Sequence, residues 1–295
     1  MEISASVVKE LREKTGLGMM LCKKALSDAN GNMELAIETL RKQGQATAAK
    51  RAGKAAKQGK VTIVSDASCC ILYEVNSETD FVAKNDDFMG FIAALGTLLL
   101  EKKPTDLQAA KALTSPAFNG LTVEAKVLEL VAKIGENISF RRYCKETVSS
   151  ANEKLFTYNH GDGRIGILVK LAVDSAALGN QAVLDIGKDL AMQVAASNPL
   201  AIDRAAMDKA FGPLIEKEKE IYFTQAQTSG KPEQVWPKIV DGKLDKFYKE
   251  STLLDQPFIR EPEKTVAARI AVAEKAASAK ITVASFVRFE LGAEA

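Results

Sequence analysis

The sequence predicts an α+β fold, with a small helical bundle followed by two related subdomains that each carry helices on an antiparallel sheet. The chain has 295 residues, which suggests two or three domains with an ample core. Only 6% of the residues are aromatic, and small helix-forming residues are abundant, which favours more helix than strand. Residues 61–150 and 151–292 follow one order of predicted elements, strand, strand, helix, strand, as an internal duplication would.

Residues 1–44 are predicted to form three short helices around one small core. Ser6 can cap the first helix, which ends at the Thr15–Gly18 turn. The second helix covers Met19–Ala29, and Asn32 can cap the third. The apolar positions expected inside are Val7, Val8, Leu11, Leu35, Ala36, Ile37 and Leu40. Such a bundle resembles the ubiquitin-associated type.

Residues 45–60 are rich in alanine, lysine and glycine and contain no acidic residue. The segment has too few large apolar residues for a core of its own, so we expect a basic, partly helical linker. Contact with RNA is the less favoured interpretation, because no aromatic residue is interleaved with the basic ones to stack on bases.

The first subdomain, residues 61–150, should begin with a hairpin and end with a strand. Its predicted strands are Val61–Val64, Cys69–Val75 and Ile138–Tyr143, and its predicted helices are Phe88–Leu100 and Thr122–Ile134. Ser65–Ser68 provides the hairpin turn, and Gly135 ends the second helix.

The second subdomain, residues 151–292, repeats this order. Its predicted strands are Lys154–Tyr158, Ile165–Val173 and Ile281–Leu291, and its predicted helix is Ala182–Ala196. An insertion at 203–250 carries two runs of apolar residues at helical spacing, which predicts a helical hairpin. The hairpin either contacts another chain or folds back on its own domain.

The stretch Thr79–Val82 is the most informative part of the sequence. It lies between the buried strand Cys70–Val75 and the apolar helix that starts at Phe88. A large aromatic residue beside a carboxylate, as in Asp80–Phe81, is unsuited to a core when it lies in a polar turn. We therefore expect an exposed ring that fills a pocket of another protein, with a charge beside it.

Several classes of function are disfavoured. The formal net charge of +2 does not indicate nucleic acid as the main partner, and no apolar run reaches membrane-spanning length. The N-terminus does not have the pattern of a secretory signal, so we expect a cytoplasmic protein. The chain has four cysteines and no CxxC pair, so we expect reduced thiols at Cys22, Cys69, Cys70 and Cys144.

Cofactor and metal chemistry is also disfavoured. Gly161–Gly166 fits the GxGxxG pattern, but it leads into a predicted strand, whereas a dinucleotide site needs a helix there. His160 is the only histidine, which excludes a multi-histidine metal site. The acidic residues between Glu78 and Asp87 do not have the spacing of a calcium loop. We expect no cofactor, no metal and no catalytic residues.

Several segments resemble the translation elongation factor Ts family, in the same order along nearly the whole chain. They are Val8–Arg12, Thr15–Met20, Cys22–Leu26, Glu74–Asn76, Thr79–Lys84, Val131–Ile138 and Val194–Ser197. The resemblance implies a guanine-nucleotide exchange factor for the GDP-bound GTPase elongation factor Tu. It implies that the chain is not an enzyme and has no catalytic residues of its own.

The resemblance also implies roles for particular residues. In that family a Thr-Asp-Phe-Val segment enters the partner near its Mg²⁺ site and dislocates the ion, a role that falls here to Thr79, Asp80, Phe81 and Val82. The implied supporting contacts are Leu11, Arg12, Met19, Met20, Ile134, Gly135 and His160. The 203–250 hairpin resembles the coiled-coil arm that the family uses against the partner or a second copy, so a homodimer is one expectation.

Some relatives continue into a further C-terminal helix that grips the partner, and we expect that contact to be absent or replaced in this chain. Two other functions remain open. One is an adaptor that binds ubiquitin-like domains through the 1–44 bundle, and the other is an RNA-binding factor that uses the 45–60 segment. Neither accounts for the Asp80–Phe81 pair or the duplicated core, and the resemblance implies neither membrane nor direct nucleic-acid contact.

Overall fold

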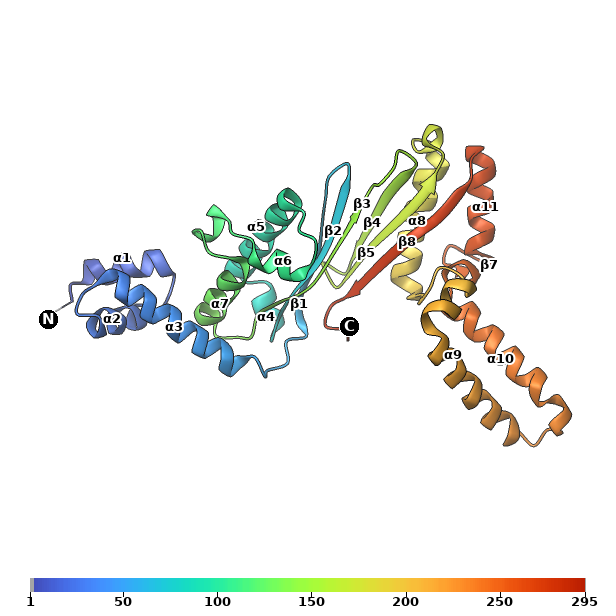
Figure 1. The fold of residues 1–295 in the computed structure, drawn as a ribbon, viewed down its shortest axis with the longest axis horizontal. Coiled ribbons are helices and arrows are strands. Elements are labelled where there is room, and N and C mark those ends of the chain that lie inside the picture. The colour runs from blue at the N-terminus through green and yellow to red at the C-terminus, as the bar shows by residue number, and fades with distance from the viewer. Residues whose placement is uncertain (1–2, 295) are drawn as a thin grey trace. The chain divides into compact units, whose positions relative to one another are not determined.

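A computed structural model describes residues 3–294, and the chain separates into two compact units (Figure 1). The first unit runs to Lys145 and takes in Gly161–Arg164 and the chain from Phe289 onward. The second unit contains Glu146–His160 and Ile165–Arg288. Each unit has its own three-stranded sheet with helices, so the predicted α+β class is confirmed.

Three helices begin the first unit: α1 (Ala5–Thr15), α2 (Met19–Asp28) and α3 (Met33–Arg51). Asn32 caps α3, and Gly16 ends α1 in the left-handed region with φ 68°, both at predicted positions. The N-cap of α1 is Ser4, so the prediction of Ser6 was wrong. Ser4 lies in extended backbone and accepts from the Val7 N–H, whereas Ser6 is already inside the helix.

The core of the bundle contains most of the expected residues. Its buried members include Val8, Leu11, Leu17, Cys22, Leu26, Ala36 and Leu40. Leu35 differs from the prediction, because 48% of its surface is exposed. Ala36 and Leu40 are four residues apart and define the inner face of α3, and Leu35 is rotated about 100° from Ala36.

Helix α3 extends well past the point where a linker was expected to begin. Residues 45–51 are its last two turns, and the non-helical connection is limited to residues 52–57. Alanine, lysine and glutamine are good helix formers, which supports this extension. A tertiary contact also fixes it, because Gly44 faces Ala132 of α7 (Val123–Ile134), where an added Cβ would lie 3.1 Å from the Ala132 Cβ.

The first sheet has the order β1-β2-β3, from β1 (Gln58–Ser65), β2 (Cys69–Ser77) and β3 (Ser139–Thr147). β1 and β2 are antiparallel, with Val61 opposite Glu74. Between β2 and β3 the chain forms α4 (Asp80–Ala83), α5 (Asp86–Lys102), α6 (Leu107–Ala112), a 3₁₀ turn (Pro116–Phe118) and α7. Every residue of β2 is buried, because the strand lies in the middle of the sheet under the helices.

The second sheet has the matching order β4-β5-β8, from β4 (Glu153–His160), β5 (Ile165–Val173) and β8 (Ile281–Glu290). The second strand of the hairpin is therefore central in both sheets, as a duplication predicts. Helix α8 (Gln181–Ser197) packs closely on the sheet. A Cβ at Gly187 would lie 2.4 Å from the Phe156 ring, so only glycine permits this approach.

Three elements of the second unit were not predicted: β6 (Pro257–Phe258), β7 (Glu261–Thr265) and α11 (Val266–Ala277). Helix α11 is rich in alanine and its buried positions are only Val266, Ile270 and Ala273, so its apolar periodicity is weak in sequence. Its pairing with α8 and the 3₁₀ turn at Leu253–Asp255 provides the packing that stabilises it.

The predicted helical hairpin is present as α9 (Arg204–Gln227) and α10 (Trp236–Ser251), joined through a 3₁₀ turn at Glu233–Val235 (Figure 1). The two helices pack on each other around Met207 and Ile215. Phe211 departs from helical geometry just before Pro213, which has no N–H for the helix ladder.

None of the helices within residues 3–294 combines the length and the apolar character that a membrane-spanning helix requires.

Candidate functional site

The Thr79–Val82 segment lies at the exit of β2, where the sequence placed it between a strand and a helix. It forms the one-turn helix α4, which was not predicted. The Thr79 hydroxyl accepts from the Val82 N–H at 3.4 Å and so caps this turn. Asn85 caps the following helix α5 by accepting from the Asp87 and Phe88 N–H groups. The one-turn helix α4 therefore lies between its own N-cap and the N-cap of α5.

The side chains of this turn point in opposite directions. Phe81 is 81% exposed, the highest value among the large exposed apolar residues that the structure describes. Val82 is 8% exposed and packs into the core of the first unit. Asp80 is exposed and lies 3.1 Å from the Lys84 ammonium. The turn thus anchors itself through Val82 and presents an aromatic ring and a carboxylate to the outside.

Glu136, which is 57 residues from Thr79 in the sequence, binds the Thr79–Val82 turn. Its Oε1 accepts from the Thr79 hydroxyl at 2.8 Å, and its Oε2 accepts from the Thr79 N–H at 3.0 Å. Glu136 follows Gly135, which ends α7 in the left-handed region with φ 84°. The structure therefore joins two predicted sites, Thr79–Val82 and Ile134–Gly135, through a residue that was not predicted as a site residue.

A second pair of hydrogen bonds reinforces this junction. The Asn137 N–H donates to Glu78 Oε1 at 2.7 Å, and the Asn137 amide donates to the Lys54 carbonyl at 2.8 Å. Arg51, at the end of α3, lies 3.5 Å from the same Glu78 oxygen. Adjacent residues on one segment bind adjacent residues on the other, so the base of the turn is restrained while Phe81 stays exposed.

The bundle presents some of its predicted contact residues and buries another. Met19 and Met20 are 52% and 77% exposed, and Arg12 is also exposed. Leu11 is 0% exposed in the bundle core. Its expected role as a direct partner contact is therefore corrected, because a side chain without accessible surface can only support the bundle from inside.

His160 belongs to the second unit and ends strand β4, whereas a loop position was expected. It is exposed, and its Nδ1 lies 3.0 Å from the Tyr158 hydroxyl. The turn after it, Gly161–Arg164, belongs to the first unit, where the Gly163 carbonyl accepts from the Val61 N–H at 2.8 Å. This turn leads into strand β5, so the GxGxxG pattern has the strand context that the sequence predicted.

The structure also bears on thiol and metal chemistry. Cys69 and Cys70 are buried in β2, and burial raises the pKa of the Cys70 thiol to about 11, which keeps it protonated and unreactive near neutral pH. Within residues 3–294, histidine, cysteine, aspartate and glutamate side chains do not form a group of three that could hold a metal ion.

Comparison with known proteins adds the family. A model of the family described as "Elongation factor TS" matches residues 78–293. An elongation factor Ts of Syntrophotalea carbinolica is 43% identical over 99% of this chain and 94% of its own length. One from Clostridium acetobutylicum is 43% identical over 98% of this chain and 92% of its own length, and one from Alkalilimnicola ehrlichii is 44% identical over 99% and 93%. The chain therefore belongs to the elongation factor Ts family.

Proposed function

We propose that this chain is a guanine-nucleotide exchange factor that binds GDP-bound elongation factor Tu and accelerates the release of GDP. The proposal rests on membership of the elongation factor Ts family and on one structural observation. Phe81 is 81% exposed on a turn whose base is restrained by Glu136 and Glu78. An exposed aromatic ring on a restrained turn is suited to entering a pocket, because little conformational entropy is lost on binding.

The proposed action is a wedge. Phe81 inserts between elements of the GTPase near its bound Mg²⁺, and Asp80 provides a charged contact beside it. Lowering the affinity of the GTPase for its nucleotide a thousandfold requires about 4 kcal/mol of coupling free energy. Burial of one phenylalanine ring supplies roughly 1.5–3 kcal/mol, so dislocation of the Mg²⁺ must contribute the remainder. The coupling is reciprocal, so a tightly bound nucleotide weakens the binding of this chain in turn.

Other parts of the chain extend the proposed interface. Met19, Met20 and Arg12 are exposed on the bundle, and exposed methionines adapt readily to a partner surface. The turn at Ile134–Gly135 supports the wedge through Glu136, and His160 is available as an exposed contact. Leu11 has only an internal role.

The hairpin α9–α10 is proposed to contact either the GTPase or a second copy of the chain. Near its tip, Phe223 packs edge-on against Trp236 at 6.0 Å between ring centroids, yet remains 45% exposed. Ile221 and Val235 are also exposed, at 38% and 37%. We place this activity in the cytoplasm, and it needs no cofactor bound to this chain.

A stopped-flow measurement of fluorescent GDP release from elongation factor Tu tests the proposal. Phe81→Ala is expected to slow release by about ten- to a hundredfold, from the lost burial of the ring. Its melting temperature should match that of the wild type, because the ring packs little in the free protein. Val272→Ala is the control, since Val272 is an exposed apolar residue of α11 at 46%. A wild-type chain without effect on GDP release, or an unchanged rate with Phe81→Ala, would refute the proposal.

A further inference from the structure

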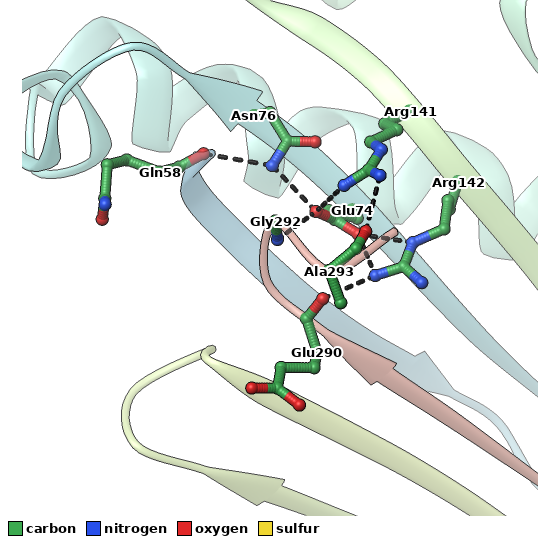
Figure 2. Close-up of polar contacts among 8 residues, drawn as sticks. All are labelled: Gln58, Glu74, Asn76, Arg141, Arg142, Glu290, Gly292 and Ala293. Atoms are coloured by element: carbon green, nitrogen blue, oxygen red, sulfur yellow. Dashed lines mark hydrogen bonds and ion pairs between the residues drawn. The ribbon is translucent and has the colours of Figure 1, made fainter. Parts of the chain in front are cut away.

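Glu74 is a carboxylate without accessible surface in the middle of β2, five residues before Thr79 (Figure 2). Its Oε1 accepts from the Asn76 amide at 2.8 Å and from the Gly292 N–H at 2.9 Å, with Arg141 Nη1 at 3.4 Å. Its Oε2 accepts from Arg142 Nε at 2.6 Å and is also paired with Arg142 Nη2. The buried charge is thus surrounded by donors from three separate segments of the first unit.

The same two arginines also hold the C-terminal segment, residues 289–293. Arg141 Nη2 donates to the Ala293 carbonyl at 2.5 Å, and Arg142 Nη2 donates to the Glu290 carbonyl at 2.7 Å (Figure 2). The Arg142 guanidinium also lies 4.4 Å from the centroid of the Phe289 ring. These contacts all lie within the first unit, so the C-terminal segment closes over Glu74 and provides part of its neutralisation.

The C-terminal segment reaches Glu74 through a backbone conformation that requires glycine. Gly292 has φ 71°, and a Cβ there would lie 2.5 Å from the Lys57 carbonyl oxygen. A side chain at this position would therefore collide with backbone and move the Gly292 N–H away from the carboxylate. The hydrogen bond from the Gly292 N–H to Glu74 therefore depends on this glycine conformation.

The Glu74 cluster continues along β2 to the Thr79–Val82 turn. The fully buried Asn76 amide donates to Glu74 and also to the Gln58 carbonyl at 3.1 Å. Asn76 Oδ1 is buried and has no hydrogen-bond donor among residues 3–294. The next residue, Ser77, donates its hydroxyl to the Thr79 carbonyl at 2.9 Å. The hydrogen bonds of Glu74 and those of Thr79 therefore involve neighbouring residues at one end of β2.

We propose that Glu74 is a positioning residue for the Thr79–Val82 turn, and that docking of residues 289–293 is required for it to act. A buried carboxylate is stable only while its donors are in place. When the C-terminal segment undocks, Glu74 loses the Gly292 donor and becomes open to water, and the end of β2 loosens with it. The importance of this for nucleotide exchange rests on the proposed function, whereas the coupling between the two segments does not.

Hydrogen exchange of the free protein and its variants tests the coupling, since it does not depend on a partner. The variants are a chain that ends at Phe289, Glu74→Gln, and the two combined. We expect the shortened chain to exchange the amides of residues 75–79 about tenfold faster or more, which corresponds to about 1.4 kcal/mol of opening free energy. Helix α8 of the second unit should be unchanged and serves as the internal reference.

Two comparisons make this test specific. A chain that ends at Glu294 keeps the Gly292 N–H and the Ala293 amide carbonyl, so it should behave as the wild type. On the Glu74→Gln background the shortening should have a smaller effect, because the carboxylate that accepts from the Gly292 N–H is then absent, and this non-additivity measures the coupling. Additive effects, or unchanged exchange at 75–79 in the chain that ends at Phe289, would overturn the inference.

A milder variant and a kinetic assay complete the design. If the shortened chain does not fold, Arg141→Ala removes only the donor to the Ala293 carbonyl and the weaker contact to Glu74, and it should raise exchange at both 289–293 and 75–79. In the GDP-release assay the shortened chain should give a maximal rate of GDP release about tenfold lower, because the Thr79–Val82 turn would be displaced from its working position. A wild type without exchange activity would refute the proposed function and leave the hydrogen-exchange result intact.

Discussion

Thr79 donates both its hydroxyl and its backbone N–H to the carboxylate of Glu136, at 2.8 and 3.0 Å. A single charged side chain thereby fixes the residue that caps α4. Because the donors come from the cap and the acceptor follows the end of α7, two hydrogen bonds join the start of α4 to the end of α7. This pairing explains how Phe81 can be almost fully exposed and still have a defined position.

Glu136→Ala should loosen the turn and lower stability. Removal of this carboxylate leaves the partly buried Thr79 N–H and O–H without their acceptor, at a cost of about 1–3 kcal/mol. Urea unfolding followed by circular dichroism measures the loss. Glu13→Ala is the matched control, because Glu13 is an exposed helix glutamate 3.9 Å from Lys9, an ion pair of little energetic value. Equal unfolding midpoints for Glu136→Ala and the wild type would contradict the assigned role.

Gly96→Ala should destabilise the first unit, although alanine is the better helix former. A Cβ at Gly96 would lie 2.6 Å from the Tyr73 hydroxyl oxygen and 2.9 Å from Val64 Cγ1. The Tyr73 hydroxyl is fixed by its hydrogen bond to the Ile92 carbonyl at 2.9 Å, so it cannot move away freely. We expect a loss of about 1–3 kcal/mol in thermal or urea unfolding.

Gly90→Ala is the control for this substitution, because Gly90 lies in the same helix with no other atom within 4 Å of an added Cβ. There the helix propensity of alanine should act alone and stabilise the chain by up to about 1 kcal/mol. The close packing of β2 on α5 would be refuted if the two glycine substitutions changed stability in the same direction.

Asp66 should make the first unit sensitive to acid. The Lys103 ammonium at 2.7 Å, and next the Ser68 N–H and hydroxyl, hold the pKa of this carboxyl well below its usual range. Because the pKa is lower in the folded state, the stabilisation is complete above the unfolded value of about 3.9 and is lost as the pH falls below it.

The measurement is urea unfolding of the wild type and Asp66→Asn at pH 7 and at pH 2.5. The stability difference between them should be largest at pH 7 and shrink at pH 2.5, where the Asp66 carboxyl is protonated in the unfolded chain but still largely ionised in the folded protein. A difference that stays constant between the two pH values would show that the carboxylate charge is not what stabilises the β1–β2 turn.

Leu11 and Met20 should respond oppositely to truncation. Leu11→Ala leaves a cavity in the bundle core and should cost about 2–5 kcal/mol in the stability of α1–α3. Met20→Ala removes an exposed side chain and should change stability by less than about 0.5 kcal/mol, while it weakens binding to elongation factor Tu. Calorimetric unfolding and titration of the GTPase separate the two effects, and a stable Leu11→Ala variant with weakened binding would restore Leu11 as a contact residue.

Local signals in the sequence predicted much of this fold. Asn32 and Gly16 mark helix ends through contacts within four residues, and alternating or helical spacing located β2, α5 and α7. The exposure of Phe81 could also be predicted, because an aromatic ring in a polar turn has no local core to enter. Where the local signal was weak, as in alanine-rich α11, the prediction missed the element.

The order of the main strands and helices, the duplicated plan and the position of the Thr79–Val82 turn are thus determined by the sequence itself, since each depends on residues that are neighbours along the chain. Only the tertiary structure decided that α3 continues to Arg51, that Glu136 holds Thr79, and that Gly292 reaches Glu74. Such contacts join residues that are far apart in the chain, and a buried carboxylate shows its need for donors only once folding has removed its water.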